Sequence, residues 1–306
     1  MLTANKIVFQ DKYKLTGKNI CIGLIDSGTY PHPDLIEGKN KIRKFLDLIN
    51  FYNYPYDDNG HGTFISGLIS GTGKSSNGLY CGIAKNSTIY SIKAFNALGT
   101  AYIGDILFSL QTLINEASDL NLKVICLPFE VNTRDEFILN LFQSIFNIAV
   151  QNNIAIITAS GNNSNHENSI QGIALLKNCI TVGGIDTSSN NIKPYEYSSS
   201  GPFSKTQKPD LVAACVDICS TNANINYISE RSGKKLYPIA LKDPYTCYTG
   251  TSCAAAYVSG ICALLYENKP DITFTDLVAL IKISCKSLDL PKYFQGSGMI
   301  QFEKLM

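Results

Sequence analysis

What this sequence lacks already narrows its function. Positive and negative charges nearly cancel, because 26 Lys and Arg face 25 Asp and Glu in 306 residues, for a formal net charge of +1. Nucleic-acid-binding proteins usually carry a basic face or run; none is visible, so nucleic acid is not an expected partner. No apolar run reaches the roughly 18 residues of a membrane helix, and residues 1–6 are not followed by the apolar stretch of a secretory signal. We therefore expect a cytoplasmic protein with no membrane partner, whose oligomeric state stays open.

Metal-binding patterns are equally scarce. The chain has three His, and its ten Cys include no Cys-x-x-Cys pair, which disfavours a structural zinc site. Many of the cysteines lie inside apolar runs, where a free thiol packs as a small hydrophobic group; they include Cys21, Cys81, Cys126, Cys179 and Cys262. We therefore predict core thiols, with disulfides as the alternative. Core thiols are consistent with the cytosol, where cysteines stay reduced.

Apolar segments of strand length alternate with segments of helical period, which is typical of a parallel sheet covered by helices on both faces. The predicted strands are 20–25, 88–95, 124–127, 154–159 and 179–182. Between them, apolar residues recur at helical spacing over 106–117 and 137–146. Because no linker, repeat or low-complexity tract is present, we expect residues 1–306 to form one α/β domain, with 222–248 as a long surface excursion.

Three residues supply an acid, a base and a nucleophile. Asp26 follows the first predicted strand, while His61 and Ser252 each open a helix-like segment. A serine hydroxyl becomes an effective nucleophile when an imidazole removes its proton and a buried carboxylate orients that imidazole. Taken singly, Asp26 and Ser252 each also have an ordinary structural reading, since Asp and Ser commonly form turns or cap helices. The order Asp, His, Ser is one of three chain orders known for this chemistry.

The residues around these three carry a family resemblance. Residues 23–28 and 32–35 resemble the Asp-x-Gly and His-Pro-Asp-Leu signature of subtilisin-like serine proteases. Residues 61–67 resemble the family's His-Gly-Thr-x-x-x-Gly, and residues 250–254 resemble Gly-Thr-Ser-Met-Ala with Cys253 in place of methionine. Residues 159–162 resemble the family's Ala-Gly-Asn segment. The similarity extends over nearly the whole chain.

This resemblance implies a three-layer subtilisin-like fold, with a mainly parallel central sheet and helices on both faces. It also implies a serine endopeptidase that hydrolyses protein or peptide substrates. Asp26, His61 and Ser252 would be catalytic, and the Asn162 side chain and the Ser252 backbone amide would bind the oxyanion. Asn162 by itself could equally be a turn residue, because Gly161-Asn162-Asn163 is typical turn chemistry.

The family holds its substrate as an added β-strand between two enzyme segments, a general mode of peptide recognition. By resemblance, 98–102 forms one edge and 127–130 the other. The expected substrate-binding residues are Leu98, Gly99, Thr100, Ala101, Leu127, Pro128, Phe129, Glu130, Ser160 and Gly161. This chain has Pro128-Phe129-Glu130 where the family usually has Ser-Leu-Gly. We therefore expect Glu130 to narrow or charge the first specificity pocket, and a preference for a basic residue there is one possibility.

The family resemblance also bears on calcium binding and on how the activity is restrained. Family members often bind calcium in the loop after the histidine helix, but residues 71–78 contain no carboxylate, so we predict no calcium there and no cofactor. Other calcium sites stay open. Asp26 lies too near Met1 for an inhibitory pro-domain of the usual kind, which favours an enzyme of narrow specificity, such as a precursor or leader-peptide processing protease. The alternatives are a catalytically silent peptide-binding protein on the same fold and acyl transfer to an acceptor other than water.

Overall fold

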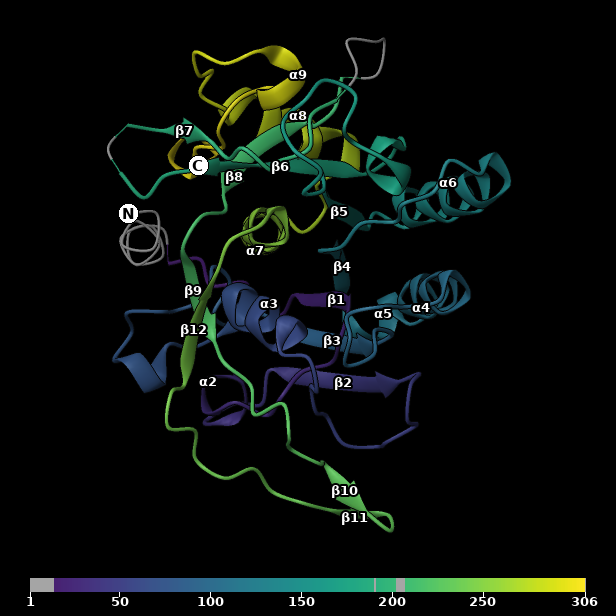
Figure 1. The fold of residues 1–306 in the computed structure, drawn as a ribbon, viewed down its shortest axis with the longest axis vertical. Coiled ribbons are helices and arrows are strands. Elements are labelled where there is room, and N and C mark those ends of the chain that lie inside the picture. The colour runs from purple at the N-terminus through teal and green to yellow at the C-terminus, as the bar shows by residue number, and fades with distance from the viewer. Residues whose placement is uncertain (1–13, 190, 202–206, 306) are drawn as a thin grey trace.

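A central eight-stranded sheet organises the molecule (Figure 1). The structure is a computed structural model, and it describes residues 14–189, 191–201 and 207–305. The strands follow the order β2-β3-β1-β4-β5-β6-β7, and β8 also pairs with β6. Every pairing is parallel except that of β7 with β6. The strands are β1 (Cys21–Asp26), β2 (Ile42–Asp47), β3 (Thr88–Lys93), β4 (Leu122–Leu127), β5 (Ala155–Ala159), β6 (Ile180–Asp186), β7 (Lys193–Pro194) and β8 (Leu211–Ala214).

Apolar side chains alternate between the two faces of this sheet. In β1, Ile22 and Leu24 join one buried cluster, whereas Cys21 and Ile25 join another. Successive side chains of a strand point to opposite faces, so a strand buried on both faces is apolar throughout. This explains why the central strands could be predicted from continuous apolar runs. All five predicted strands are present.

Helices cover both faces. In Figure 1, α3 and α7 lie to the left of the sheet, and α4, α5 and α6 lie to the right, which makes three layers. The predicted three-layer α/β architecture is confirmed. The longer helices are α3 (His61–Ser70), α4 (Ile103–Asn115), α6 (Glu136–Gln151), α7 (Thr251–Asn268) and α8 (Phe274–Ser284). The short ones are α2 (Pro33–Ile36), α5 (Ala117–Leu120) and α9 (Lys292–Gln295), with 3-10 turns at Lys74–Ser76, Gly172–Leu175 and Phe302–Lys304.

Helix α7 is central to its layer. Of its 18 residues, 15 are buried, and the run of small residues at 254–256 lets it approach the sheet closely. Ser252 is not among the buried residues. The helix is therefore anchored along its length while its second residue stays accessible.

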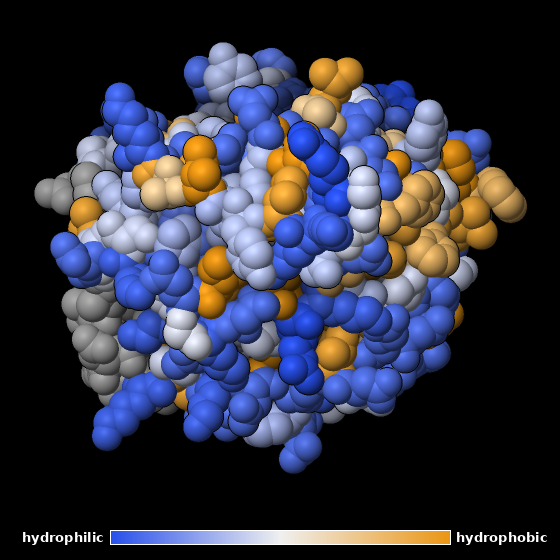
Figure 2. All heavy atoms as spheres, turned by 90° about the horizontal axis from the view of Figure 1, so that it is seen from below, coloured by the Kyte–Doolittle hydropathy of each residue, from blue (hydrophilic) through white to orange (hydrophobic). Residues whose placement is uncertain are grey.

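The predicted excursion at 222–248 is partly regular. It contains a two-stranded hairpin of β10 (Glu230–Arg231) and β11 (Lys234–Lys235), at the bottom of Figure 1. It ends in β12 (Tyr245–Tyr248), which pairs with β9 (Ile218–Thr221). Figure 2, seen from the hairpin end, shows a mainly hydrophilic surface, with apolar side chains gathered at the right, on the side of α4. Among the described residues, no helix combines the length and the apolar character needed to cross a bilayer.

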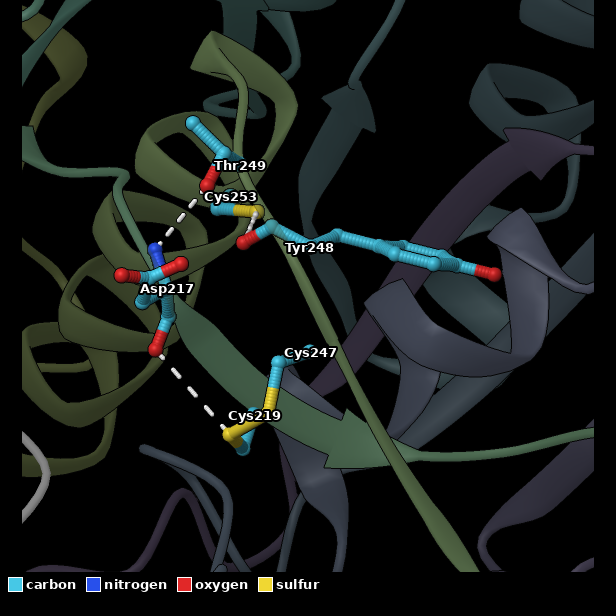
Figure 3. Close-up of a disulfide and its surroundings, with 6 residues drawn as sticks. All are labelled: Asp217, Cys219, Cys247, Tyr248, Thr249 and Cys253. Carbon is cyan, nitrogen blue, oxygen red and sulfur yellow. Dashed lines mark hydrogen bonds between the residues drawn. A yellow bond between two sulfur atoms is a disulfide. The ribbon is translucent and has the colours of Figure 1, made fainter.

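The preference for core thiols is right for most cysteines and wrong for two. Cys21, Cys126, Cys179, Cys215, Cys253 and Cys262 are buried thiols, but Cys219 and Cys247 form a disulfide (Figure 3). The reason is the antiparallel pairing of β9 with β12, whose register places Cys219 directly opposite Cys247. Their Cα atoms lie 4.0 Å apart. Neither cysteine is in one of the long apolar runs of the sequence, and the disulfide ties the strand before α7 to its neighbour.

Candidate active site

Asp26 and His61 lie in direct contact. Asp26 is the last residue of β1, and His61 is the first residue of α3. The His61 Nδ1 atom lies 2.9 Å from each Asp26 carboxylate oxygen. Gly62 permits this approach, because a Cβ on it would lie 2.1 Å from the Gly28 carbonyl oxygen. The Asp26 side chain is 5% exposed and the His61 side chain 31% exposed, so the carboxylate is shielded while the ring reaches the surface.

A second carboxylate, which the sequence analysis did not single out, positions the start of α3. Asp57 is fully buried and accepts hydrogen bonds from the Ser27 hydroxyl and from the backbone N–H groups of Asn59, Gly60 and Thr63. It also accepts from the Thr63 hydroxyl at 2.6 Å. Unpaired N–H groups at a helix N-terminus need acceptors, and Asp57 supplies them on both sides of His61. The Asp57 carboxylate thereby connects the loop after β1 to the first turn of α3.

A buried lysine stabilises the loop that follows Asp26. The Lys93 ammonium, at the end of β3, donates to the carbonyl oxygens of Ser27 and Phe95 at 2.7 and 3.0 Å and to the Asp58 carboxylate at 2.5 Å. It also lies 5.0 Å from the centroid of the Tyr56 ring. A buried charge is stable only when it is paired and hydrogen-bonded, and here every contact goes to a segment next to Asp26 or His61. No motif in the sequence marks Lys93 as a functional residue.

The electrostatic surroundings favour the protonated form of His61. Burial lowers the pKa of its imidazole, but the charge of Asp26, its hydrogen bond and the charge of Asp57 outweigh burial and raise that pKa above the usual 6.5. An opposite charge within a few ångströms stabilises the charged form of a base. The arrangement therefore stabilises an imidazolium, the species that forms when an imidazole accepts a proton.

The N-terminus of α7 carries Ser252 and contacts Asn162. The backbone N–H of Thr251 donates to Asn162 Oδ1 at 3.0 Å, which fixes the side-chain amide. The Ser252 Oγ atom and Asn162 Oδ1 both lie 3.6 Å from the position of a Cβ built on Gly250, and Asn162 Nδ2 lies 3.8 Å from it. Ser252 and the Asn162 amide therefore share one small region. Within the described ranges, Asn162 Nδ2 has no hydrogen-bond acceptor.

The starts of α3 and α7 are also brought together. The Phe64 and Tyr248 rings lie 4.5 Å apart between centroids, and the Tyr248 hydroxyl lies 3.7 Å from the Cβ position of Gly60. Gly60 precedes His61, and Tyr248 lies four residues before Ser252. The Ser252 hydroxyl makes no hydrogen bond to another described residue, so within the described part of the chain a hydrogen bond joins Asp26 to His61 and none joins His61 to Ser252. Such bonds are often long in the absence of substrate.

A cleft opens beside His61. A cavity of about 270 Å³ brings predicted substrate-binding residues together with the acid and the base; its lining is Asp26, Ser27, Asn59, His61, Phe95, Gly99, Pro128 and Phe129. The Phe95 and Phe129 rings pack 4.9 Å apart and connect the two predicted edges. Leu98, Thr100, Ala101, Leu127, Ser160 and Gly161 do not line this cavity, although Leu98 is largely exposed next to Gly99.

Glu130 does not line the cavity either. It lies against the loop after β5, where its carboxylate accepts from the backbone N–H of Asn162 and from the Asn163 side-chain amide. As for metals, the described part of the chain contains no group of three or more His, Cys, Asp or Glu side chains placed to hold one ion.

Residues 17–298 match the model of the Subtilase family of peptidases. The chain belongs to the subtilase family. Its similarity to serine protease AprX of Bacillus subtilis (strain 168) is 29% identity, covering 97% of this chain and 68% of that protein. Subtilisin Savinase of Lederbergia lenta is 25% identical, with 94% and 91% covered. Sphericase has a similar fold, with a TM-score of 0.76 at 23% identity and 94% and 92% coverage.

These similarities confirm the family resemblance found in the sequence. This subtilase is accordingly a hydrolase of the serine protease class, and it acts on protein or peptide substrates. The match to the family model covers the three segments that contain Asp26, His61 and Ser252.

Proposed function

We propose that this subtilase is a serine endopeptidase in which Asp26, His61 and Ser252 form the catalytic triad. The observation that carries the proposal is the contact of His61 Nδ1 with both oxygens of the buried Asp26 carboxylate, at 2.9 Å each. This contact leaves Nε2 as the ring atom available to a nucleophile and stabilises the imidazolium. The accessible position of Ser252, at the start of an otherwise buried helix, supports its role as that nucleophile.

The reaction proceeds through an acyl-enzyme. His61 Nε2 takes the Ser252 proton as Oγ attacks the peptide carbonyl carbon, whose oxygen becomes an oxyanion. The Asn162 side-chain amide and the Ser252 backbone N–H donate to this oxygen. When the tetrahedral intermediate collapses, the C–N bond breaks and His61 passes its proton to the leaving amine. Water then attacks the ester carbonyl and gives a proton to His61, which returns it to Ser252 Oγ as the acid product leaves.

The cleft supports recognition of an extended peptide. Residues 98–101 and 127–130 are the two proposed edges, and Gly99 from one and Pro128 and Phe129 from the other line the cavity together with Phe95, whose ring packs against Phe129. Ser160 and Gly161 belong to the proposed wall of the first specificity pocket.

The finer proposal is an intracellular enzyme that processes a precursor or leader peptide. The cytosol keeps cysteines reduced, so an intracellular enzyme must stay active when Cys219 and Cys247 are thiols. No cofactor is proposed, and residues 71–78 are not proposed as a calcium site.

Labelling with a fluorophosphonate probe tests the central proposal. The wild-type protein should form a covalent adduct at Ser252, and Ser252→Ala should form none while keeping its thermal midpoint. An unlabelled, folded wild type would instead support the silent peptide-binding alternative.

A second experiment tests the processing role. A processing enzyme should leave casein mostly intact while it cleaves a few sites in a complex peptide mixture. Broad degradation of casein would remove the processing role.

A further inference from the structure

Glu130 bridges two loops that leave the sheet side by side. It follows β4, and Asn162 follows β5, the parallel neighbour of β4. Glu130 Oε1 accepts from the Asn162 backbone N–H at 2.6 Å, and Oε2 accepts from Asn163 Nδ2 at 2.5 Å. Hydrogen bonds to a charged acceptor are short and about twice as strong as neutral ones. Both carboxylate oxygens are therefore engaged with the loop that contains Asn162.

The backbone of this loop is shaped to receive the carboxylate. Gly161 has φ +106°, and a Cβ there would lie 2.8 Å from Glu130 Oε2 and 2.9 Å from Ser199 Oγ. Residues other than glycine rarely adopt a backbone φ in this range. Ser199 also holds this loop, because it donates its backbone N–H to the Gly161 carbonyl at 2.8 Å and its hydroxyl accepts from the Asn163 N–H at 2.9 Å. Glu130 and Ser199 thus both fix the loop by hydrogen bonds to its backbone.

Asn162 is consequently fixed at both ends. Its backbone is held by Glu130 and its side-chain oxygen by the N–H of Thr251, the residue before Ser252. A shift of the backbone would move Nδ2 relative to Ser252. Donors that stabilise an oxyanion act by being fixed in place before the charge develops, so the holding of this backbone bears directly on that function.

We propose that Glu130 is a positioning residue that fixes Asn162 as the oxyanion donor, rather than a residue whose charge selects basic substrates. The inference rests on the proposed role of Asn162. Glu130 is exposed and keeps its charge, but both of its carboxylate oxygens accept from N–H groups of the loop, and the carboxylate fills the space over Gly161. Glu130 therefore affects the first specificity pocket by closing space and by ordering the loop.

A double-mutant cycle tests this coupling. Removing an oxyanion donor typically lowers kcat by about 10²–10³, so we expect that loss for Asn162→Ala. Glu130→Ala removes only its positioning and should lower kcat by roughly 10–100-fold on every peptide, with KM changed less than about threefold. If Glu130 acts through Asn162, the double variant should be no slower than Asn162→Ala alone. Multiplying losses would overturn the proposal, as would an unchanged kcat in Glu130→Ala.

Two further variants separate positioning from charge and from folding. Glu130→Gln keeps an acceptor for the Asn162 N–H, and Asn163 can turn its amide to pair with the new one, so most of kcat should return. A Gln variant as slow as the Ala variant would contradict the proposal. So would a Glu130→Ala defect confined to the KM of Lys or Arg peptides, since that result indicates selection by charge. The matched control is Glu167→Ala, which should behave as wild type, because Glu167 is an exposed acidic residue of the same loop whose side chain makes no hydrogen bond or ion pair with another described residue.

The same samples report on the proposed function independently. Final labelling of Ser252 by a fluorophosphonate should be complete in wild type, Glu130→Ala and Glu130→Gln, even where it is slower. Absence of labelling in folded wild type would remove the proposed function itself. Normal labelling together with independent effects of Glu130 and Asn162 would remove only the positioning role.

Discussion

Replacing Asp57 by asparagine tests whether a buried carboxylate organises the start of α3. The substitution keeps the shape of the side chain and removes its charge. Oδ1 accepts three hydrogen bonds and Oδ2 accepts two. In either orientation of the asparagine amide, its NH₂ group replaces an oxygen that accepts at least two hydrogen bonds. The Ser27 and Thr63 hydroxyls can rotate to accept from this group, but at least one backbone N–H then faces a donor in a site with no solvent.

The size of the effect follows from the lost backbone bond and from the weakening of the other bonds, because a hydrogen bond to a neutral acceptor is about half as strong as one to a charged acceptor. Each hydrogen bond to a charged acceptor contributes about 1.5–3 kcal/mol, so we expect a loss of about 3–6 kcal/mol in the free energy of unfolding. That is a large part of the roughly 5–15 kcal/mol available to a typical domain. At roughly 2 °C per kcal/mol for a chain of this size, the thermal midpoint should fall by about 6–12 °C.

Differential scanning calorimetry at one fixed scan rate measures the midpoint. Asp119→Asn, at an exposed position in α5, is the matched control and should stay within about 0.5 kcal/mol of wild type. Asp57→Asn should also move the acid limb of the pH profile of kcat/KM to lower pH, because the Asp57 charge helps to raise the pKa of His61. A midpoint and an acid limb equal to those of wild type would refute the role assigned to Asp57.

Two further predictions concern pH and the disulfide. In the proposed mechanism His61 acts as a base in its neutral form, and its raised pKa means that kcat/KM should rise with pH with a midpoint above 6.5; a midpoint at or below 6.5 would contradict the electrostatics described above. Reduction of the Cys219–Cys247 disulfide, which closes a loop of sequence separation 28, should cost about 3–4 kcal/mol of unfolding free energy in urea titrations. A Cys219→Ser, Cys247→Ser variant should be insensitive to the reductant. Equal urea midpoints for oxidised and reduced wild type would show that the disulfide adds no stability.

The sequence predicts the inner strands well and the outer ones poorly. Parallel strands buried on both faces are continuous apolar runs, so β1 and β3 to β6 can be recognised directly. Strand β2 lies at the edge of the sheet, and exposed Arg43 and Lys44 interrupt its apolar pattern. Strand β8 has four residues and follows a stretch with no periodic signal. Both were missed because their place in the sheet depends on pairing partners and not on their own pattern.

The candidate site divides in a similar way. The contact of Asp26 with His61 was anticipated, because the motifs around the two residues carry the family resemblance that implies it. Asp57 and Lys93 were not, since an acidic residue in a turn and a lysine at a strand end have common surface explanations. The role of each arises from partners distant in the chain, such as the Ser27 hydroxyl and carbonyl. Their burial is the signal, and no single sequence displays it.

The chain order of the elements has a consequence during synthesis on the ribosome. A nascent polypeptide acquires the segments of Asp26 and His61 first, and the helix with Ser252, which packs against β4, β5 and β6, follows all eight strands of the main sheet. On the proposed mechanism, the acid and the base are therefore synthesised well before the nucleophile. A chain whose translation stopped before α7 would lack proteolytic capacity.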